Sequence, residues 1–306
     1  MRSLQPILLF ASIALALMAA SCGRSGSSAT KTIGVSLQTR AHVFYRDLEE
    51  GLLEEAKAQN YELIITAGEF DLGKQMAQME DFVARKVDAI ILVPVDSKGV
   101  GPAIAKANAA GIPVFTADIA AQEGSVVSHV ASDNIAGGRL AGEYIVTALN
   151  GQGDVAIIDQ PNVSSVLDRV QGFREAIAKS PGIKVVADVN GEGVRDKAFT
   201  ATADVLQAHP GLKGIFGIND DSALGALDAV TQYRKSGIII VGYDATPPAA
   251  DAILKGSPLK ADVVQYPKLI GAKTIQQIAA HFSGAAVPPL VPVEVGIVDS
   301  VALMTK

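Results

Sequence analysis

The sequence predicts an α/β protein made of two lobes of parallel sheet. Short apolar runs rich in β-branched residues alternate with longer amphipathic stretches along the chain. Runs that are apolar throughout indicate strands buried on both faces, which is typical of parallel sheets covered by helices. This alternation forms two arrays of similar size. Two arrays predict two lobes with a cleft between them, and small-molecule sites commonly lie at such a boundary.

The first array begins at Lys31. We expect strands over 32–38, 61–67, 88–95 and 112–118, separated by helices over 44–60, 71–86 and 97–110. Each strand is short and rich in β-forming residues, and each helical stretch is longer and amphipathic, so the segments fit βα units.

The second array follows the same order. We expect residues 125–134 to lead into a helix over 135–150, then strands over 153–160, 183–189, 212–219 and 237–244, with helices over 164–180, 196–210 and 220–233. Gly51, Gly137 and Gly138 fall inside helical patterns, where glycine costs stability. We therefore expect another element to pack closely against each of them.

Composition excludes several classes of function. A net charge of −6 argues against nucleic-acid binding, which needs a basic surface. The four histidines are scattered and there is a single cysteine, so the sequence predicts no metal site, no disulfide and no cofactor. Hydrophobic residues make up 49% of the chain and charged residues 19%, which supports a large core.

The amino-terminal segment predicts export and a lipid anchor. An uncharged run over 7–21 follows Arg2, and its small residues directly precede Cys22. A charged start, an apolar core and small residues form a secretory signal over 1–21. A cysteine at that point is similar to the lipobox of bacterial lipoproteins. We therefore expect Cys22 to be lipidated and 22–30 to be a flexible tether outside the cytoplasm; an ordinary cleaved signal is the alternative.

Polar residues recur where apolar runs stop. Gln38, Asp118, Asn219 and Asp244 each stand at the end of an expected strand. Ligands of open parallel sheets bind outside the carboxyl ends of the strands, so these side chains predict a site built from several loops. Helix capping also favours Asp and Asn at such junctions, and for any one residue both interpretations stay open.

Several segments together resemble a known family. The resemblance rests on VVSHVASDNIAGGRLAGEYI (126–145), RVQGF (169–173), AHPGLKGIFGINDDSALGALDAV (208–230), VGYDATP (241–247) and IGAK (270–273). They are similar to the ribose-binding branch of the periplasmic sugar-binding proteins, and the likeness covers about 31–300. It implies doubly wound lobes joined by a three-segment hinge, and a monomer that closes on one sugar. The family delivers ligand to the permease of an ABC importer, and some members also to a chemoreceptor.

The resemblance also implies lobe boundaries and site residues. It places the amino-terminal lobe at 31–132 plus 266–294 and the carboxyl-terminal lobe at 133–265 plus 295–306. The residues that it places against the ligand are Gln38, His42, Phe44, Tyr45, Asp118, Ile119, Arg169, Asn219, Tyr243, Asp244 and Gln265. Carboxylates, amides and an arginine suit sugar hydroxyls, and aromatic faces suit the C–H surface of the ring. Tyr243 has a second interpretation, in which it packs beneath the site.

Departures from the family pattern argue against ribose. Ile119 stands where ribose binders have an arginine, Val93 and His42 replace asparagines, and Gly193 replaces an aromatic residue. A site that lacks hydroxyl partners on one edge favours a deoxy sugar, another pentose or a polyol.

Two other functions deserve comparison with sugar import. A sugar-sensing subunit that docks on a chemoreceptor or sensor kinase would need the same cleft. A glycoside-processing enzyme could use Asp118 and Asp244 as an acid and base, but the sequence offers no nucleophile with a partnered base. We therefore expect a binding protein rather than an enzyme.

Overall fold

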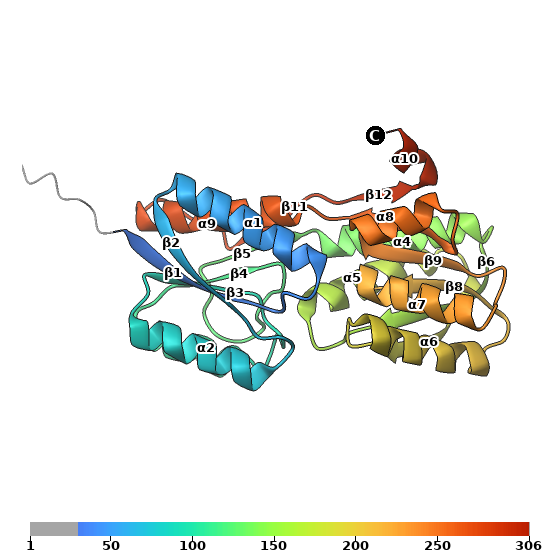
Figure 1. The fold of residues 1–306 in the computed structure, drawn as a ribbon, viewed down its shortest axis with the longest axis horizontal. Helices are drawn as coiled ribbons and strands as arrows, with labels where there is room; N and C mark the ends of the chain where they lie inside the picture. The colour runs from blue at the N-terminus through green and yellow to red at the C-terminus, as the bar shows by residue number, and fades with distance from the viewer. Residues whose placement is uncertain (1–29, 306) are drawn as a thin grey trace, which may run out of the picture.

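A computed structural model describes residues 30–305 as two α/β lobes, each built on a six-stranded sheet (Figure 1). The predicted signal segment over 1–21 and Cys22 lie outside the described residues, as does most of the tether. Among the residues described, no helix is long and apolar enough to cross a membrane.

The first sheet has the strand order β11-β5-β4-β3-β1-β2, and the paired strands in it run parallel. Its strands are β1 Lys31–Leu37, β2 Tyr61–Ala67, β3 Ala89–Leu92, β4 Val114–Ala117, β5 Ser128–Ser132 and β11 Leu290–Val293. Residues of β3 and β4 are buried throughout, as expected for strands covered on both faces.

Helices cover both faces of this sheet. They are α1 Val43–Ala58, α2 Leu72–Arg85, α3 Gly101–Ala109 and α9 Pro267–Phe282. Figure 1 shows α1 and α9 together on one side and α2 on the other. The α1–α9 pair packs closely because Gly51 leaves room, since a Cβ there would lie 2.1 Å from the Lys268 carbonyl oxygen.

The second sheet has the order β12-β10-β9-β8-β6-β7, parallel except for the antiparallel β10–β12 pair. Its strands are β6 Gln152–Asp159, β7 Gly182–Asn190, β8 Leu212–Gly217, β9 Ile239–Asp244, β10 Leu259–Val264 and β12 Gly296–Asp299. The helices of this lobe are α4 Asn134–Ala148, α5 Ser164–Ile177, α6 Arg195–Ala208, α7 Asp220–Gln232, α8 Pro247–Leu254 and α10 Ser300–Met304. Gly137 and Gly138 face Tyr243 and the backbone of Arg169, so the close packing expected at all three helical glycines is confirmed.

The chain passes between the two sheets at three places within residues 30–305. The crossings follow β5, β10 and β11, so that α4, α9 and β12 each begin on the other side. The predicted fold class is therefore confirmed, including the three connections. The elements after residue 245 were not predicted individually, and the predicted helix over 97–110 begins only at Gly101.

Candidate functional site

A cavity lies between the lobes, at the carboxyl ends of the strands. Its lining residues lie at or after the ends of six strands. These are β1 and β4 of the first sheet and β6, β8, β9 and β10 of the second. The lining residues are Gln38, His42, Phe44, Tyr45, Asp118, Ile119, Gln160, Val163, Ser165, Val166, Arg169, Ile218, Asn219, Asp244 and Gln265. The structure thus brings ten of the eleven predicted ligand residues together.

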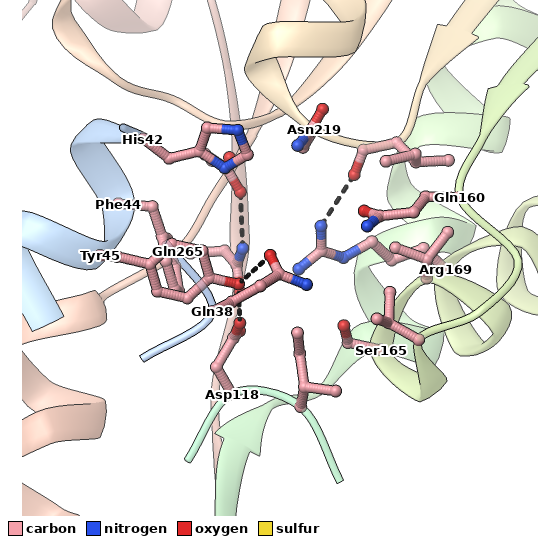
Figure 2. A pocket seen from close by; sticks show the side chains of 15 residues that line it. Gln38, His42, Phe44, Tyr45, Asp118, Gln160, Ser165, Arg169, Asn219 and Gln265 are labelled. Carbon is pink, nitrogen blue, oxygen red and sulfur yellow. Dashed lines mark hydrogen bonds between the residues drawn. The ribbon is translucent and has the colours of Figure 1, made fainter. Parts of the chain in front are cut away.

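The first lobe contributes a cluster around the Tyr45 hydroxyl (Figure 2). This hydroxyl lies 3.0 Å from Asp118 Oδ2, to which it donates, and 3.0 Å from Gln38 Oε1. Asp118 Oδ1 and Gln38 Nε2 are buried and have no hydrogen-bond partner among the described residues. Burial raises the pKa of the Asp118 carboxyl, and Arg169 and Tyr45 oppose that rise. One acceptor and one donor on this side are therefore open to a ligand.

Apolar side chains form part of the wall. Phe44 and Tyr45 meet edge to face with ring centroids 5.1 Å apart, and both line the cavity while also joining the core. Ile119 lines the cavity as well. Val93, which stands where the family pattern has an asparagine, is fully buried in the core and does not line the cavity.

Arg169 is the main group from the second lobe. Its Nε donates to Asn134 Oδ1 and its Nη1 to the Ile218 carbonyl, both at 2.8 Å. Figure 2 shows the guanidinium entering the cavity from the side opposite Tyr45. Burial lowers the pKa of Arg169, but Tyr243 and Asp244 outweigh it and raise the pKa overall. The cavity therefore holds one permanent positive charge.

The remaining polar groups of the second lobe are tied to the protein. Asn219 caps α7 by accepting from the Ser222 N–H at 2.8 Å, and its Nδ2 donates to the Gly193 carbonyl at 3.0 Å. Gln265 Nε2 donates to Asp244 Oδ1 at 2.7 Å. Gln265 Oε1 is buried and has no hydrogen-bond partner among the described residues. Asn219 thus has the capping role considered as an alternative and lines the cavity too.

Both cleft aspartates have strained backbones. The φ angle is 61° at Asp118 and 126° at Asp244, in the region that side chains other than glycine rarely adopt. Such strain persists only where surrounding contacts hold it, and it is concentrated at functional sites.

Tyr243 is the predicted residue that does not line the cavity. Its side chain is fully buried, and the Arg169 guanidinium lies 3.9 Å from its ring centroid. The Tyr243 hydroxyl donates to Asn134 Oδ1 at 3.3 Å. This position favours the interpretation in which Tyr243 packs beneath the site, because the Arg169 guanidinium lies over its ring.

Contacts between the lobes close the edges of the cavity. His42 Nε2 lies 3.4 Å from Asp221 Oδ2 of the other lobe, and burial lowers the pKa of His42 against the effect of Asp221. Ser164 Oγ accepts from the Ala120 N–H and donates to the Ala120 carbonyl, each at 3.0 Å. These contacts exist only while the lobes are together.

Several lining residues were not predicted from the sequence, and Gln160 is the most informative of them. Gln160 ends the apolar run over 153–160, so the strand-end pattern used for Gln38 could have found it. It also explains Gly193, where a Cβ would lie 2.3 Å from Gln160 Oε1. The side chain of Gln160, which directly follows β6, occupies the space that a side chain at position 193 would need.

The described residues contain no group of three or more His, Cys, Asp or Glu side chains able to hold a metal ion. The polar atoms available in the cavity are donors and acceptors of hydrogen bonds, together with one guanidinium. Chemically, the arrangement can surround a small polar molecule from two sides.

Comparison with known proteins agrees with this architecture. The family model for a periplasmic binding protein domain matches residues 33–286. The ribose import binding protein RbsB of Escherichia coli (strain K12) is 34% identical over 276 residues, covering 90% of this chain and 92% of the relative. A xylitol-binding protein of Mycolicibacterium smegmatis is 31% identical over 240 residues, covering 77% of this chain and 68% of the relative.

Among solved structures, an ABC transporter solute binding protein from Mycobacterium smegmatis with bound glycerol superposes with a TM-score of 0.85. It is 34% identical and covers 90% of this chain and 96% of its own. Since the family model spans most of the chain and the match to the Escherichia coli relative covers 92% of that protein, this chain belongs to the periplasmic binding protein domain family.

Proposed function

We propose that this protein binds one neutral monosaccharide or polyol between its lobes and delivers it to an ABC importer. The observation that carries the proposal is a set of three buried polar atoms that have no hydrogen-bond partner within residues 30–305: Gln38 Nε2, Asp118 Oδ1 and Gln265 Oε1. All three belong to residues that line the cavity. A buried polar atom without a partner is costly, and ligand hydroxyls that both donate and accept would satisfy all three.

The charges in the cavity support a neutral ligand. Asp118 and Asp244 flank Arg169, so an anionic ligand would meet two carboxyl groups and a cationic ligand would meet a guanidinium. A hydroxyl can donate to either carboxylate and accept from Arg169, so each group gains a partner without a net charge on the ligand. The relatives support this class, because their names or bound molecules are ribose, xylitol and glycerol.

The ligand is not expected to be ribose. Ile119 presents an apolar surface directly beside Asp118, so a ligand edge with fewer hydroxyls fits there. We therefore favour a deoxy sugar, another pentose or a polyol.

The test is calorimetric titration of purified protein with D-ribose, 2-deoxy-D-ribose, xylitol, glycerol and, as a charged control, D-ribose 5-phosphate. We expect a neutral member to bind and the phosphate to bind far more weakly. The matched variant is Gln38→Leu, which removes the open donor while keeping a similar size. Failure of every neutral member to bind, or preference for the phosphate, would contradict the proposal, and tight D-ribose binding would contradict the ligand choice alone.

Capture is proposed to proceed by hinge closure. The lobes, which we place at 31–132 plus 266–294 and 133–265 plus 295–306, separate in the open state and expose the two halves of the site. A ligand that contacts both halves binds the closed state better and shifts the equilibrium toward it. The closed faces would then be recognised by the importer permease.

The location is proposed from the amino-terminal segment. We propose that Cys22 is lipidated, so that a monomeric receptor is held outside the cytoplasm near its importer, at an effective concentration set by the tether. Docking on a chemoreceptor or sensor kinase would use the same binding step. Neighbouring genes for a permease and an ATPase favour import, whereas a neighbouring sensor kinase gene favours sensing. The family consists of solute-binding proteins, which argues against an enzyme.

A further inference from the structure

Two buried carboxyl groups lie behind the cavity and have no role in the proposed binding step. Asp262 on β10 is fully buried, and Asp220 at the start of α7 is 3% exposed. Neither lines the cavity. Isolated buried charges are strongly unfavourable, so this pair requires an explanation.

The hydrogen bonds of the pair account for one oxygen of each carboxyl group. Asp262 Oδ1 accepts from the Ala245 N–H at 3.1 Å. Asp220 Oδ2 accepts from the Thr246 N–H at 2.7 Å and from the Thr246 hydroxyl at 2.5 Å. Asp262 Oδ2 and Asp220 Oδ1 are left without an N–H or O–H donor among the described residues. The two carboxyl groups lie close together, because they bind the N–H groups of the adjacent residues Ala245 and Thr246. These two oxygens are therefore available for a hydrogen bond between the side chains.

Two ionised carboxylates cannot hydrogen-bond to each other, because both only accept. No Lys, Arg or His side chain forms an ion pair with either residue in the described part of the chain. The remaining way to satisfy both oxygens is one proton between them, as in other close carboxyl pairs.

We propose that Asp220 and Asp262 share one proton, and that the pair acts as a positioning clamp for the ligand residue Asp244. The clamp rests on the proposed function only in its last step, the effect on ligand affinity. The shared proton itself is a property of the unliganded protein.

The clamp holds the turn that carries Asp244. Both Asp244 and Ala245 have positive φ angles, 126° and 55°, which cost energy for residues with side chains. The next two backbone N–H groups, of Ala245 and Thr246, are those bound by the pair. Asp244 is thus aimed into the cavity by two backbone hydrogen bonds directly after it.

The sheet has space reserved for the pair. Gly242 lies opposite Asp262 in the β9–β10 register, and a Cβ at Gly242 would lie 2.6 Å from Asp262 Oδ2. A larger residue at 242 would push aside the oxygen that shares the proton.

The charged surroundings favour protonation. Burial is the main cause that raises the pKa of Asp220 to about 6 and that of Asp262 well above its ordinary range. The titratable groups that act on the pair are Asp221 on α7 and Asp244 on β9, and both raise these values. Arg169 on α5 acts on Asp244 rather than on the pair.

The sign of the pH effect follows from linkage. A proton held more tightly in the folded protein stabilises it fully below the unfolded carboxyl pKa and less as pH rises through the folded value. The clamp should therefore weaken from about pH 4 upward, with much of the loss around and above pH 6.

The first test compares Asp262→Asn with Asp262→Ala. An asparagine can accept from the Ala245 N–H and donate to Asp220 without a shared proton, so we expect xylitol or 2-deoxy-D-ribose affinity within about threefold of the unaltered protein. Alanine leaves the Ala245 N–H unpaired and Asp220 charged, and should weaken binding by about tenfold or more. Asp251→Asn, at an exposed position of α8, controls for the loss of one carboxylate.

The second test needs no ligand. Thermal unfolding of the unliganded protein is measured from pH 4.5 to 8.5, with infrared detection of protonated carboxyl groups at pH 7. We expect Asp262→Asn to lose less stability with rising pH than the unaltered protein and to lack one protonated carboxyl band. Parallel stability curves with unchanged infrared bands would overturn the shared proton. Equal affinity of the Asn and Ala variants would overturn the clamp, and if no sugar binds at all, the proposed function fails while this second test still decides the shared proton.

Discussion

The two halves of the cavity use the same residue types in different ways. On the first lobe, Asp118 and Gln38 each keep one polar atom without a protein partner. On the second lobe, Arg169 and Asn219 are already bonded to backbone carbonyls, and Asn219 also caps a helix. Most of the second half is therefore fixed before ligand arrives, with Gln265 Oε1 as an exception, while the first half offers two polar atoms that have no partner among the described residues.

This difference separates affinity from stability. A side chain bonded within its own lobe supports the fold as well as the ligand, so removing it should affect both. A side chain with a buried polar atom that lacks a partner contributes to ligand binding and destabilises the unliganded protein. Matched substitutions in the two halves therefore test whether binding and stability respond differently in each.

Arg169→Ala should give the largest effect. It removes a buried charged donor from the cavity and leaves the Ile218 carbonyl without that partner, so we expect ligand binding to weaken by about 2–4 kcal/mol and stability to fall as well. Calorimetry and thermal unfolding measure the two effects. Arg174→Ala, on the exposed side of the same helix, is the control. A dissociation constant within threefold of the unaltered protein would show that Arg169 does not contact ligand.

Asp118→Asn should weaken binding without weakening the fold. We expect a loss of about 2 kcal/mol in ligand binding, because an acceptor for a hydroxyl is replaced by an amide. The unliganded protein should be as stable as before or more stable at pH 7, since burial disfavours the ionised carboxyl. If the variant unfolded earlier than the unaltered protein, the contrast between the lobes would fail.

The lobes should also differ in their response to pH. Burial lowers the pKa of His129 on β5 to about 4, so its contribution is complete above the ordinary histidine value and is lost as pH falls toward 4. Burial raises the pKa of Asp159 on β6 to about 6, so its contribution is lost as pH rises from about 4 to 6.

His129→Asn tests the first of these effects. Asparagine keeps an acceptor for the Thr116 hydroxyl, which lies 2.9 Å from His129 Nδ1. In urea unfolding, we expect the acid-dependent His129 contribution to lower the free energy of unfolding of the unaltered protein by on the order of 2 kcal/mol between pH 7.5 and 4.5. The variant should not show this loss. His209→Asn, at the end of α6, serves as control. If both variants lost the same free energy of unfolding on acidification, His129 would not be the cause of that loss.

Asn219→Ala should lower stability more clearly than Asp118→Asn. It removes the cap of α7, for which about 1 kcal/mol is expected, together with a hydrogen bond to Gly193. Thermal unfolding without ligand is the measurement. Asn219→Ser can still cap the helix and should recover most of the stability, so equal losses for both variants would contradict the capping role.

Local pattern was enough to predict the fold and many of the residues that line the cavity. Continuous apolar runs and the polar residues after them placed Gln38, Asp118, Asn219 and Asp244 correctly, because strand ends in a parallel sheet meet at one edge. Gln160 followed the same pattern and was overlooked. The orientation of Tyr243 was not accessible, because it depends on Arg169 packing across its ring from a different helix.

The buried pair shows a stronger limit of sequence analysis. Asp262 lies in a part of the chain for which no element was predicted, and in the sequence it resembles any solvated aspartate. Its burial and its closeness to Asp220 arise only when β10 is placed beside β9 and the start of α7. Val93 illustrates the same limit, since its position near a strand end did not reveal that its side chain faces the core.

Ser164→Ala should have the smallest effect and tests whether the halves act independently. The Ser164 hydroxyl joins α5 to Ala120 of the other lobe by two hydrogen bonds, so it stabilises closure without belonging to either half. Its loss should weaken ligand binding by up to about 1 kcal/mol and speed dissociation, while unfolding of the open protein stays unchanged. Small-angle X-ray scattering should show a more extended unliganded protein, with Ser125→Ala as control. Unchanged dissociation would mean that the two hydrogen bonds of the Ser164 hydroxyl do not help to hold the lobes together, and that the two halves close on the ligand independently of them.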